Sequence, residues 1–200
     1  MREKFAENGT TFITTYYTYE GKDLDKIKYG LLTFYSYFTK TSVVFIIAII
    51  LGTFLETILF KCCYALIRSF AFGIHASKNI YCWLTTIFIY ILVPYLIKTI
   101  TINEQLKFWI IMISIFSFLL YAPSDTEKRP LINRQKRHFS KLMSLAILMF
   151  FELIIIFTKN NLLVNSAIFS LIIECICLWP ITYKIFRMPY NNYKTYAKKV

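Results

Sequence analysis

The sequence has few acidic residues and few histidines, and it lacks the motifs of several common classes of site. It contains 11 Asp and Glu against 23 Lys and Arg, for a formal net charge of +12, with two histidines and five glycines. It has no glycine-rich phosphate loop, internal repeat or low-complexity tract. The five cysteines are an odd number without a spaced finger-type pair. A complete disulfide framework and a zinc finger are therefore not indicated.

Apolar residues, by contrast, are abundant. They make up 57% of the chain, which is too many for an ordinary soluble domain. Five apolar runs approach the ~20 residues that cross a bilayer. We therefore predict an all-α, polytopic integral membrane protein with runs at 43–60, 80–97, 108–122, 142–157 and 162–185.

The basic residues predict the topology. Six lie in residues 1–40, six in 121–141 and five from residue 184 on, so the positive-inside rule places all three segments in the cytoplasm. This placement accounts for the charge without a nucleic-acid partner, and we expect none. Five crossings cannot put both termini on one side. A sixth is needed, and its only candidate is residues 62–74, a short or re-entrant helix whose return brings residues 75–82 to the cytoplasmic boundary.

A histidine and a cysteine lie seven residues apart between two apolar segments. In an unbroken helix His75 and Cys82 would share a face but lie ~10 Å apart along the axis. Ser77 and Asn79 favour turns and N-caps, so we expect one helix to end near Gly73 and another to begin near Asn79. The break lets the imidazole reach the thiol. It also puts Cys82 in a first helical turn, where the dipole and N–H groups stabilise a thiolate or an oxyanion.

Three readings of this pair remain open from the residues alone. A cysteine nucleophile needs a base, and histidine is the usual one. A lone His near a lone Cys is, however, more often incidental than catalytic. Zinc is the third reading, with Cys62, Cys63, His75 and Cys82 as ligands, although adjacent cysteines project differently from a helix.

Two motifs together resemble the AgrB family. They are IRSFAFGIHASKNIYC and, later in the chain, YAPSDTEKRPLI. The family pattern has an Arg, a Gly-Gly-x-His-Ala, a Cys seven residues past the His, and a Tyr-Ala-Pro-x-Asp loop followed by a basic residue and Pro. One departure is Phe72, which replaces the first Gly of the pair. The matching positions are Arg68, Gly73, His75, Ala76, Cys82 and 121–130.

AgrB proteins are membrane-embedded cysteine endopeptidases that process the AgrD autoinducer propeptide in Gram-positive quorum sensing. The resemblance implies that Cys82 attacks a peptide carbonyl near the end of the propeptide core, with His75 as general base. An acyl-enzyme thioester remains, and a thiol or hydroxyl of the propeptide then closes a thiolactone or lactone ring. The resemblance also implies a homodimer and a reaction without metal or cofactor. The charge distribution described above places this protein in the cell membrane with its termini and site on the cytoplasmic side.

Several further residues are candidates for substrate binding or support. Arg68 lies in an apolar segment, where an ion costs ~2.5 kcal/mol or more unless it is paired. It either pairs with Glu56, contacts a substrate carboxylate or snorkels to the interface. Glu56, Glu152 and Glu174 are intramembrane carboxylates and therefore functional candidates. Asp125 either orients His75 or caps its loop. Gly73 and Ser77 complete this set around the histidine.

The basic loop has two readings. It is either the positive-inside anchor or a dock for the acidic C-terminal part that the family's propeptides carry. The residues concerned are Lys128, Arg129, Arg134, Lys136 and Arg137.

We expect a single membrane domain over residues 1–200. It comprises an amphipathic arm at 1–41, with apolar residues at helical spacing over 24–38, membrane helices at 42–185 and a cytoplasmic tail at 186–200. The catalytic segment is 68–83 and the cytoplasmic loop is 121–141. Two other functions remain open. One is a peptide transporter, because intramembrane charges and a broken helix also suit a translocation path. The other is a non-catalytic scaffold that holds the propeptide at the membrane.

Overall fold

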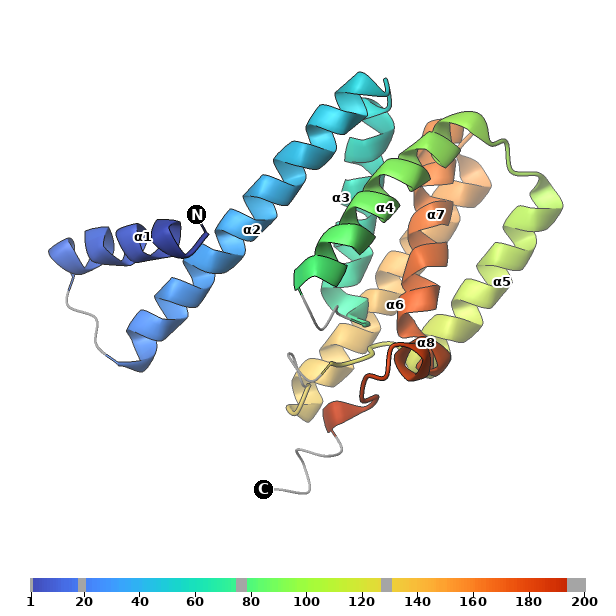
Figure 1. Ribbon diagram of the computed structural model, residues 1–200. Helices are drawn as coiled ribbons and strands as arrows, with labels where there is room; N and C mark the ends of the chain where they lie inside the picture. Colours follow the sequence, from blue (N-terminus) through green and yellow to red (C-terminus); the bar gives the residue numbers. More distant parts are fainter. Residues whose placement is uncertain (1, 18–20, 75–78, 127–130, 194–200) are drawn as a thin grey trace. The chain divides into compact units, whose positions relative to one another are not determined.

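The computed structural model describes residues 2–17, 21–74, 79–126 and 131–193, and every regular element in these ranges is an α-helix. Five of the described helices are long and apolar enough to cross a membrane, which confirms the predicted all-α, polytopic class. The helices, drawn in Figure 1, are α1 (Arg2–Tyr16), α2 (Lys22–Ile50), α3 (Phe54–Ala71), α4 (Asn79–Thr99), α5 (Glu104–Tyr121), α6 (Arg134–Phe157), α7 (Asn161–Leu178) and α8 (Pro180–Ile185).

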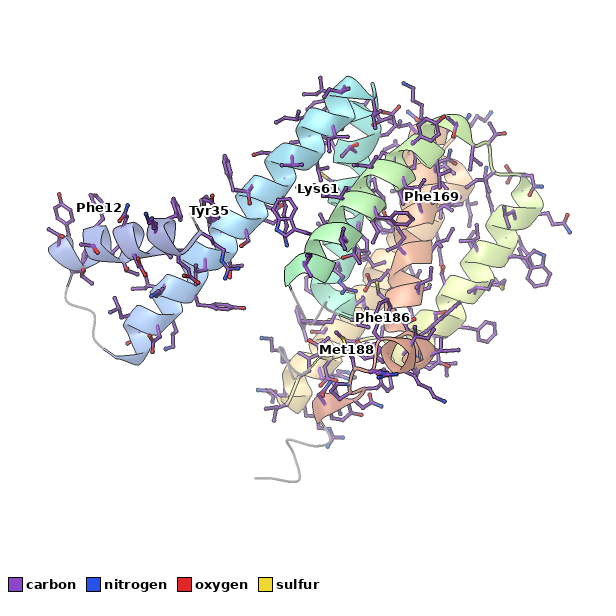
Figure 2. All side chains as sticks on the ribbon, in the orientation of Figure 1. Phe12, Tyr35, Lys61, Phe169, Phe186 and Met188 are labelled. Atoms are coloured by element: carbon purple, nitrogen blue, oxygen red, sulfur yellow. The ribbon has the colours of Figure 1, made fainter. Side chains whose placement is uncertain are left out.

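Helices α1 and α2 form a first compact unit, Met1–Leu51. The rings of Phe5 and Tyr35 lie 5.2 Å apart, and Figure 2 shows Tyr35 beside α1. A Cβ at Gly9 would lie 2.8 Å from Leu31 Cδ1, so a glycine permits this close packing. The amphipathic helix predicted over 24–38 is the first part of α2. It is therefore continuous with the first membrane segment instead of forming a separate element.

The apolar run 43–60 is not one membrane segment, contrary to the sequence-based expectation. Helix α2 ends where Gly52 adopts a φ of +64°, a conformation that glycine tolerates without a steric penalty. Helix α3 begins two residues later, at Phe54. Of the short segment predicted at 62–74, residues 62–71 are consequently the second part of an 18-residue helix, which at 1.5 Å per residue rises ~27 Å, and residues 72–74 follow its end. The division into arm, membrane domain and tail remains a prediction.

Helix α7 is the centre of the second unit, Gly52–Val200. It packs against α3, α4, α5 and α6. The main core joins apolar side chains from four of these helices, among them Ile67, Phe118, Phe151 and Leu171. A smaller cluster gathers around Phe60, Val93 and Ile97, with Phe169 of α7 against it (Figure 2).

Connections between the helices of this unit alternate between its two ends (Figure 1). At one end, Lys98 Nζ donates to Gly52 O at 2.7 Å, and Asn165 Nδ2 donates to Ile97 O and Ile100 O at 3.1 and 2.8 Å. At the other end, the chain leaving α3 meets the residues after α5 and α7. The run 162–185 is divided here, because α7 ends at Leu178 and Pro180 opens α8.

Candidate functional site

Cys82 lies in the first turn of α4, as the sequence predicted. The helix begins at Asn79, and α3 ends at Ala71, so the expected break between the two helices is confirmed. The Cys82 side chain is half-buried, and its carbonyl accepts hydrogen bonds from Thr86 Oγ1 at 2.6 Å and Thr85 Oγ1 at 3.2 Å. Backbone N–H groups in a first helical turn lack intrahelical acceptors, which favours negative charge nearby.

Two of the predicted site residues in the connection between α3 and α4, His75 and Ser77, lie outside the described residues. The part that is described consists of Phe72, Gly73 and Ile74, which we call the strap. It leaves the C-terminal end of α3 and leads directly into His75 in the sequence.

The strap is bonded to two segments far away in the sequence. Gly73 N donates to Ser124 O at 2.7 Å, and Ser124 N donates to Ala71 O at 3.0 Å, which makes a single parallel β-bridge. Ile74 N donates to Cys177 O at 3.1 Å, at the end of α7. The strap therefore rests on the residue that follows the Tyr-Ala-Pro motif and on the last turn of the central helix.

Backbone conformation explains why glycine suits the strap. Phe72 has a φ of 63° and Gly73 a φ of 98°, both in the left-handed region. A Cβ on Gly73 would also clash with Arg68 Nη1 and lie 2.9 Å from Cys177 O. Gly73 thus meets both a conformational and a steric requirement, whereas Phe72 holds a conformation that side chains rarely adopt.

Arg68 lies one turn before the end of α3 and pairs with Glu174 of α7. Its Nη1 is 3.3 Å and 3.4 Å from the two carboxylate oxygens, and its Nη2 donates to Ile74 O. Of the three roles considered for Arg68 from the sequence, the pairing with Glu56 is wrong. Glu56 lies in the first turn of the same helix, twelve residues earlier, which at 1.5 Å per residue places it ~18 Å away along the axis.

Asp125 is 2% exposed and accepts three backbone hydrogen bonds. Leu131 N donates to it at 3.3 Å, Asn192 N at 2.9 Å and Tyr193 N at 2.7 Å. Its carboxylate therefore caps its own loop, one of the two roles considered from the sequence, and it also holds the segment that follows α8. The sequence offered no signal that Asp125 would bind the segment after α8, since its partners there are backbone N–H groups.

Tyr183 completes this arrangement from α8. Its hydroxyl donates to Asp125 O at 3.3 Å and lies 3.5 Å from Ser124 O. Burial raises the pKa of the Tyr183 phenol well above its usual value, so the group remains a neutral donor. Burial likewise raises the pKa of Tyr190, whose ring centroid is 5.0 Å from that of Tyr183. Figure 2 shows Phe186 and Met188 at this same end of the unit.

The basic residues of the loop differ in their surroundings. Arg134 and Lys136 are exposed in the first turn of α6, whose N-cap is Asn133. Arg137 is half-buried, with its guanidinium carbon 3.8 Å from the centroid of the Tyr193 ring. Lys128 and Arg129 lie outside the described residues.

The side chains that could bind a metal ion lie apart from one another in the described part of the chain. No group of three or more His, Cys, Asp or Glu side chains there has the spacing of a metal site. Cys62 is exposed and Cys63 is half-buried on α3, so these neighbours face different surroundings.

Comparison with known proteins agrees with the two motifs. The family model described as accessory gene regulator B matches residues 6–178. An AgrB-like protein of Clostridium acetobutylicum is 28% identical over 200 residues, which are all of this chain and 96% of the relative. An AgrB-like protein of Listeria monocytogenes serotype 4a is 30% identical over 175 residues, or 86% of this chain and 84% of the relative.

The chain is also similar to a relative that is named as accessory gene regulator protein B itself. Accessory gene regulator protein B of Staphylococcus aureus is 30% identical over 161 residues, which are 79% of this chain and 83% of that protein. No solved structure matches the chain. Since the family match spans most of the sequence and includes both motifs, the chain belongs to the accessory gene regulator B (AgrB) family of quorum-sensing membrane proteins.

Proposed function

We propose that the protein is a membrane-embedded cysteine endopeptidase that cleaves an AgrD-like propeptide and promotes its cyclisation. The observation that carries this proposal is the position of Cys82 in the first turn of α4, directly after a break in the chain that contains His75. A thiol there lies at the positive end of a helix dipole and seven residues after a candidate base in the sequence, and these are the two features that activate a cysteine nucleophile.

The chemistry proceeds in two acyl transfers. His75 takes the proton of Cys82, and the thiolate attacks the scissile carbonyl of the propeptide. The resulting oxyanion is stabilised by N–H groups of the first helical turn. The C–N bond then breaks, His75 returns the proton to the leaving amine, and the C-terminal part departs while the core remains on Cys82 as a thioester.

Ring closure is the second transfer. A thiol or hydroxyl of the bound propeptide attacks the thioester carbonyl, the C–S bond to Cys82 breaks, and a thiolactone or lactone is released. Exchange between a thioester and a thiol is nearly thermoneutral, so this step requires neither ATP nor a metal if water is kept away. The half-buried position of Cys82 at the end of an apolar helix favours such exclusion.

We assign the strap end of the second unit to the cytoplasm. The positive-inside rule compares the charges at the two ends of a bundle. In the described residues the opposite end carries Lys98, Lys107 and Lys159, whereas the strap end carries Arg134, Lys136, Arg137, Lys141, Lys184 and Arg187. Cys82 and the segment that follows α8 then lie on the side where the propeptide is made, and the basic residues of 1–40 assign the N-terminus to that side by the same rule.

Substrate docking is assigned to the same end. Arg134 and Lys136 are exposed in the first turn of α6. Their positive charges add to the positive end of the helix dipole, which makes this a favourable surface for an acidic peptide. Lys128 and Arg129, together with Arg137, extend the basic sequence in this loop. We further propose a homodimer, as the resemblance implies.

The test is propeptide cleavage by the purified protein in lipid nanodiscs, with a chelator and without nucleotide. Cleavage should persist in the native protein and fall by orders of magnitude in Cys82→Ser and His75→Ala, because two groups that act as a unit lose most of the rate when either is removed. Cys62→Ser is the matched control and should cleave normally. Robust cleavage by Cys82→Ser, or loss of activity with the chelator alone, would contradict the proposal. Propeptide binding without cleavage would favour a scaffold, and movement of uncleaved peptide would favour a transporter.

A further inference from the structure

The Arg68–Glu174 ion pair is buried between α3 and α7, near the strap end of the helix bundle. The side chains are 17% and 0% exposed, respectively. A buried ion pair generally adds little stability compared with apolar residues of similar size, because desolvation of both charges offsets their attraction. Its presence in an apolar core therefore points to a role other than stability, such as fixing one geometry.

The geometry that this pair fixes is that of the strap. One arm of the planar guanidinium faces Glu174 on α7, and the other donates to Ile74 O, the last described residue before His75. A guanidinium presents its donors in a rigid fork, so its position on Glu174 determines where the second arm points. Gly73 lacks the Cβ that would collide with this fork.

Other polar groups surround the pair without replacing Glu174. Tyr64 OH lies 3.8 Å from Cys177 Sγ, and both groups interact electrostatically with Arg68. Tyr183 also lies within electrostatic range of Arg68. None of these is a carboxylate, so within the described part of the chain Glu174 is the anionic partner that orients the guanidinium.

We propose that Glu174 is a positioning residue for propeptide processing. It acts through Arg68 on Ile74, and thereby sets the point from which His75 leaves the strap relative to the start of α4. This inference rests on the proposed function, in which His75 activates Cys82. It assigns a role to a carboxylate 92 residues from Cys82 in the sequence, where neither spacing nor motif connects the two.

The test combines steady-state cleavage with alkylation of Cys82 by iodoacetamide, read by mass spectrometry on the peptide that contains Cys82. Glu174→Gln keeps the size of the side chain but removes its charge. We expect kcat to fall about 100-fold, the loss typical of a ~1 Å displacement of a catalytic group, with KM little changed. Alkylation of Cys82 should fall to the rate of His75→Ala, and adding Glu174→Gln to His75→Ala should lower it no further.

Two further variants separate positioning from folding. Arg68→Lys keeps the charge opposite Glu174 but cannot reach both Glu174 and Ile74 O, so it should remain folded and lose kcat and alkylation in the same way. Asn165→Ala removes buried hydrogen bonds at the opposite end of α7. It should lower the thermal midpoint and leave the alkylation rate of Cys82 unchanged.

The outcomes distinguish this inference from the proposed function. Normal kcat and normal alkylation in folded Glu174→Gln, with both quantities reduced in His75→Ala, would overturn the positioning role alone. Unchanged cleavage in His75→Ala would overturn the proposed function itself. A further loss of alkylation when Glu174→Gln is added to His75→Ala would also contradict the positioning role, since Glu174 would then act independently of His75.

Discussion

Replacing Asp125 by Asn should release the segment that follows α8 and destabilise the protein. The carboxylate is buried, with Oδ2 accepting from Leu131 N and Tyr193 N, and Oδ1 accepting from Asn192 N. An amide has a single acceptor oxygen, and its NH2 group would face an N–H donor at the other position. Even in the better orientation, with the amide oxygen at Oδ2, Asn192 N loses its acceptor.

The magnitude follows from the number of bonds lost. A hydrogen bond to a charged group contributes ~1.5–3 kcal/mol, and a buried donor without an acceptor costs a similar amount. We therefore expect Asp125→Asn to cost about 2–3 kcal/mol. For a chain of this size, 1 kcal/mol shifts the thermal midpoint by ~2–4 °C, so the midpoint should fall by about 4–12 °C.

Thermal unfolding in nanodiscs and limited trypsin digestion measure the two consequences. Trypsin should cut after Arg187, which is exposed, faster in the variant than in the native protein. Asp23→Asn is the matched control. Its carboxylate forms an exposed pair with Lys26, and removing it should change stability by less than ~0.5 kcal/mol. A thermal midpoint and digestion rate equal to those of the native protein would refute the structural role of Asp125.

Three other variants or measurements test separate parts of the account. Gly73→Ala should abolish processing and cost about 2 kcal/mol or more, because its Cβ meets Arg68 and Cys177 O at a positive φ; a functional protein with normal thermal stability would contradict this. Reversing the charge of Arg134 and Lys136 together should weaken propeptide binding in a salt-sensitive manner, and unchanged binding would leave them only an anchoring role. Tags at both termini should be inaccessible from outside intact cells, and external labelling of either one would overturn the six-crossing topology.

Hydrophobicity and residue spacing predicted the class of fold and the start of α4, but they misplaced the bounds of the first membrane segment and of the helix that follows it, α3. The apolar composition continues through residues 43–60, so a hydropathy reading passes over Gly52, whose backbone conformation ends α2. Lys61 and Arg68 interrupt the apolar sequence of α3, so its 18 residues do not stand out as one helix in a hydropathy profile. The backbone conformation at Gly52 thus sets the end of α2, which the apolar composition does not reveal.

The candidate site was predictable only where its residues are close in sequence. The break between Gly73 and Asn79 follows from turn-forming residues and is visible in the sequence. The partner of Arg68 could not be predicted from the sequence, because three intramembrane carboxylates were available. Only the packing of α7 against α3 selects Glu174. The bonds between Asp125 and the chain after α8 are also inaccessible to pattern reasoning, since one partner is backbone.

The most direct test of the account is a search for the covalent intermediate. Purified protein is mixed with the propeptide in nanodiscs, quenched in acid within the first turnover, digested and analysed by mass spectrometry. The account predicts that the peptide containing Cys82 carries the mass of the propeptide core without its C-terminal part, through a bond that hydroxylamine cleaves. An adduct on another cysteine, or rapid cleavage with Cys82 unmodified throughout the time course, would contradict it.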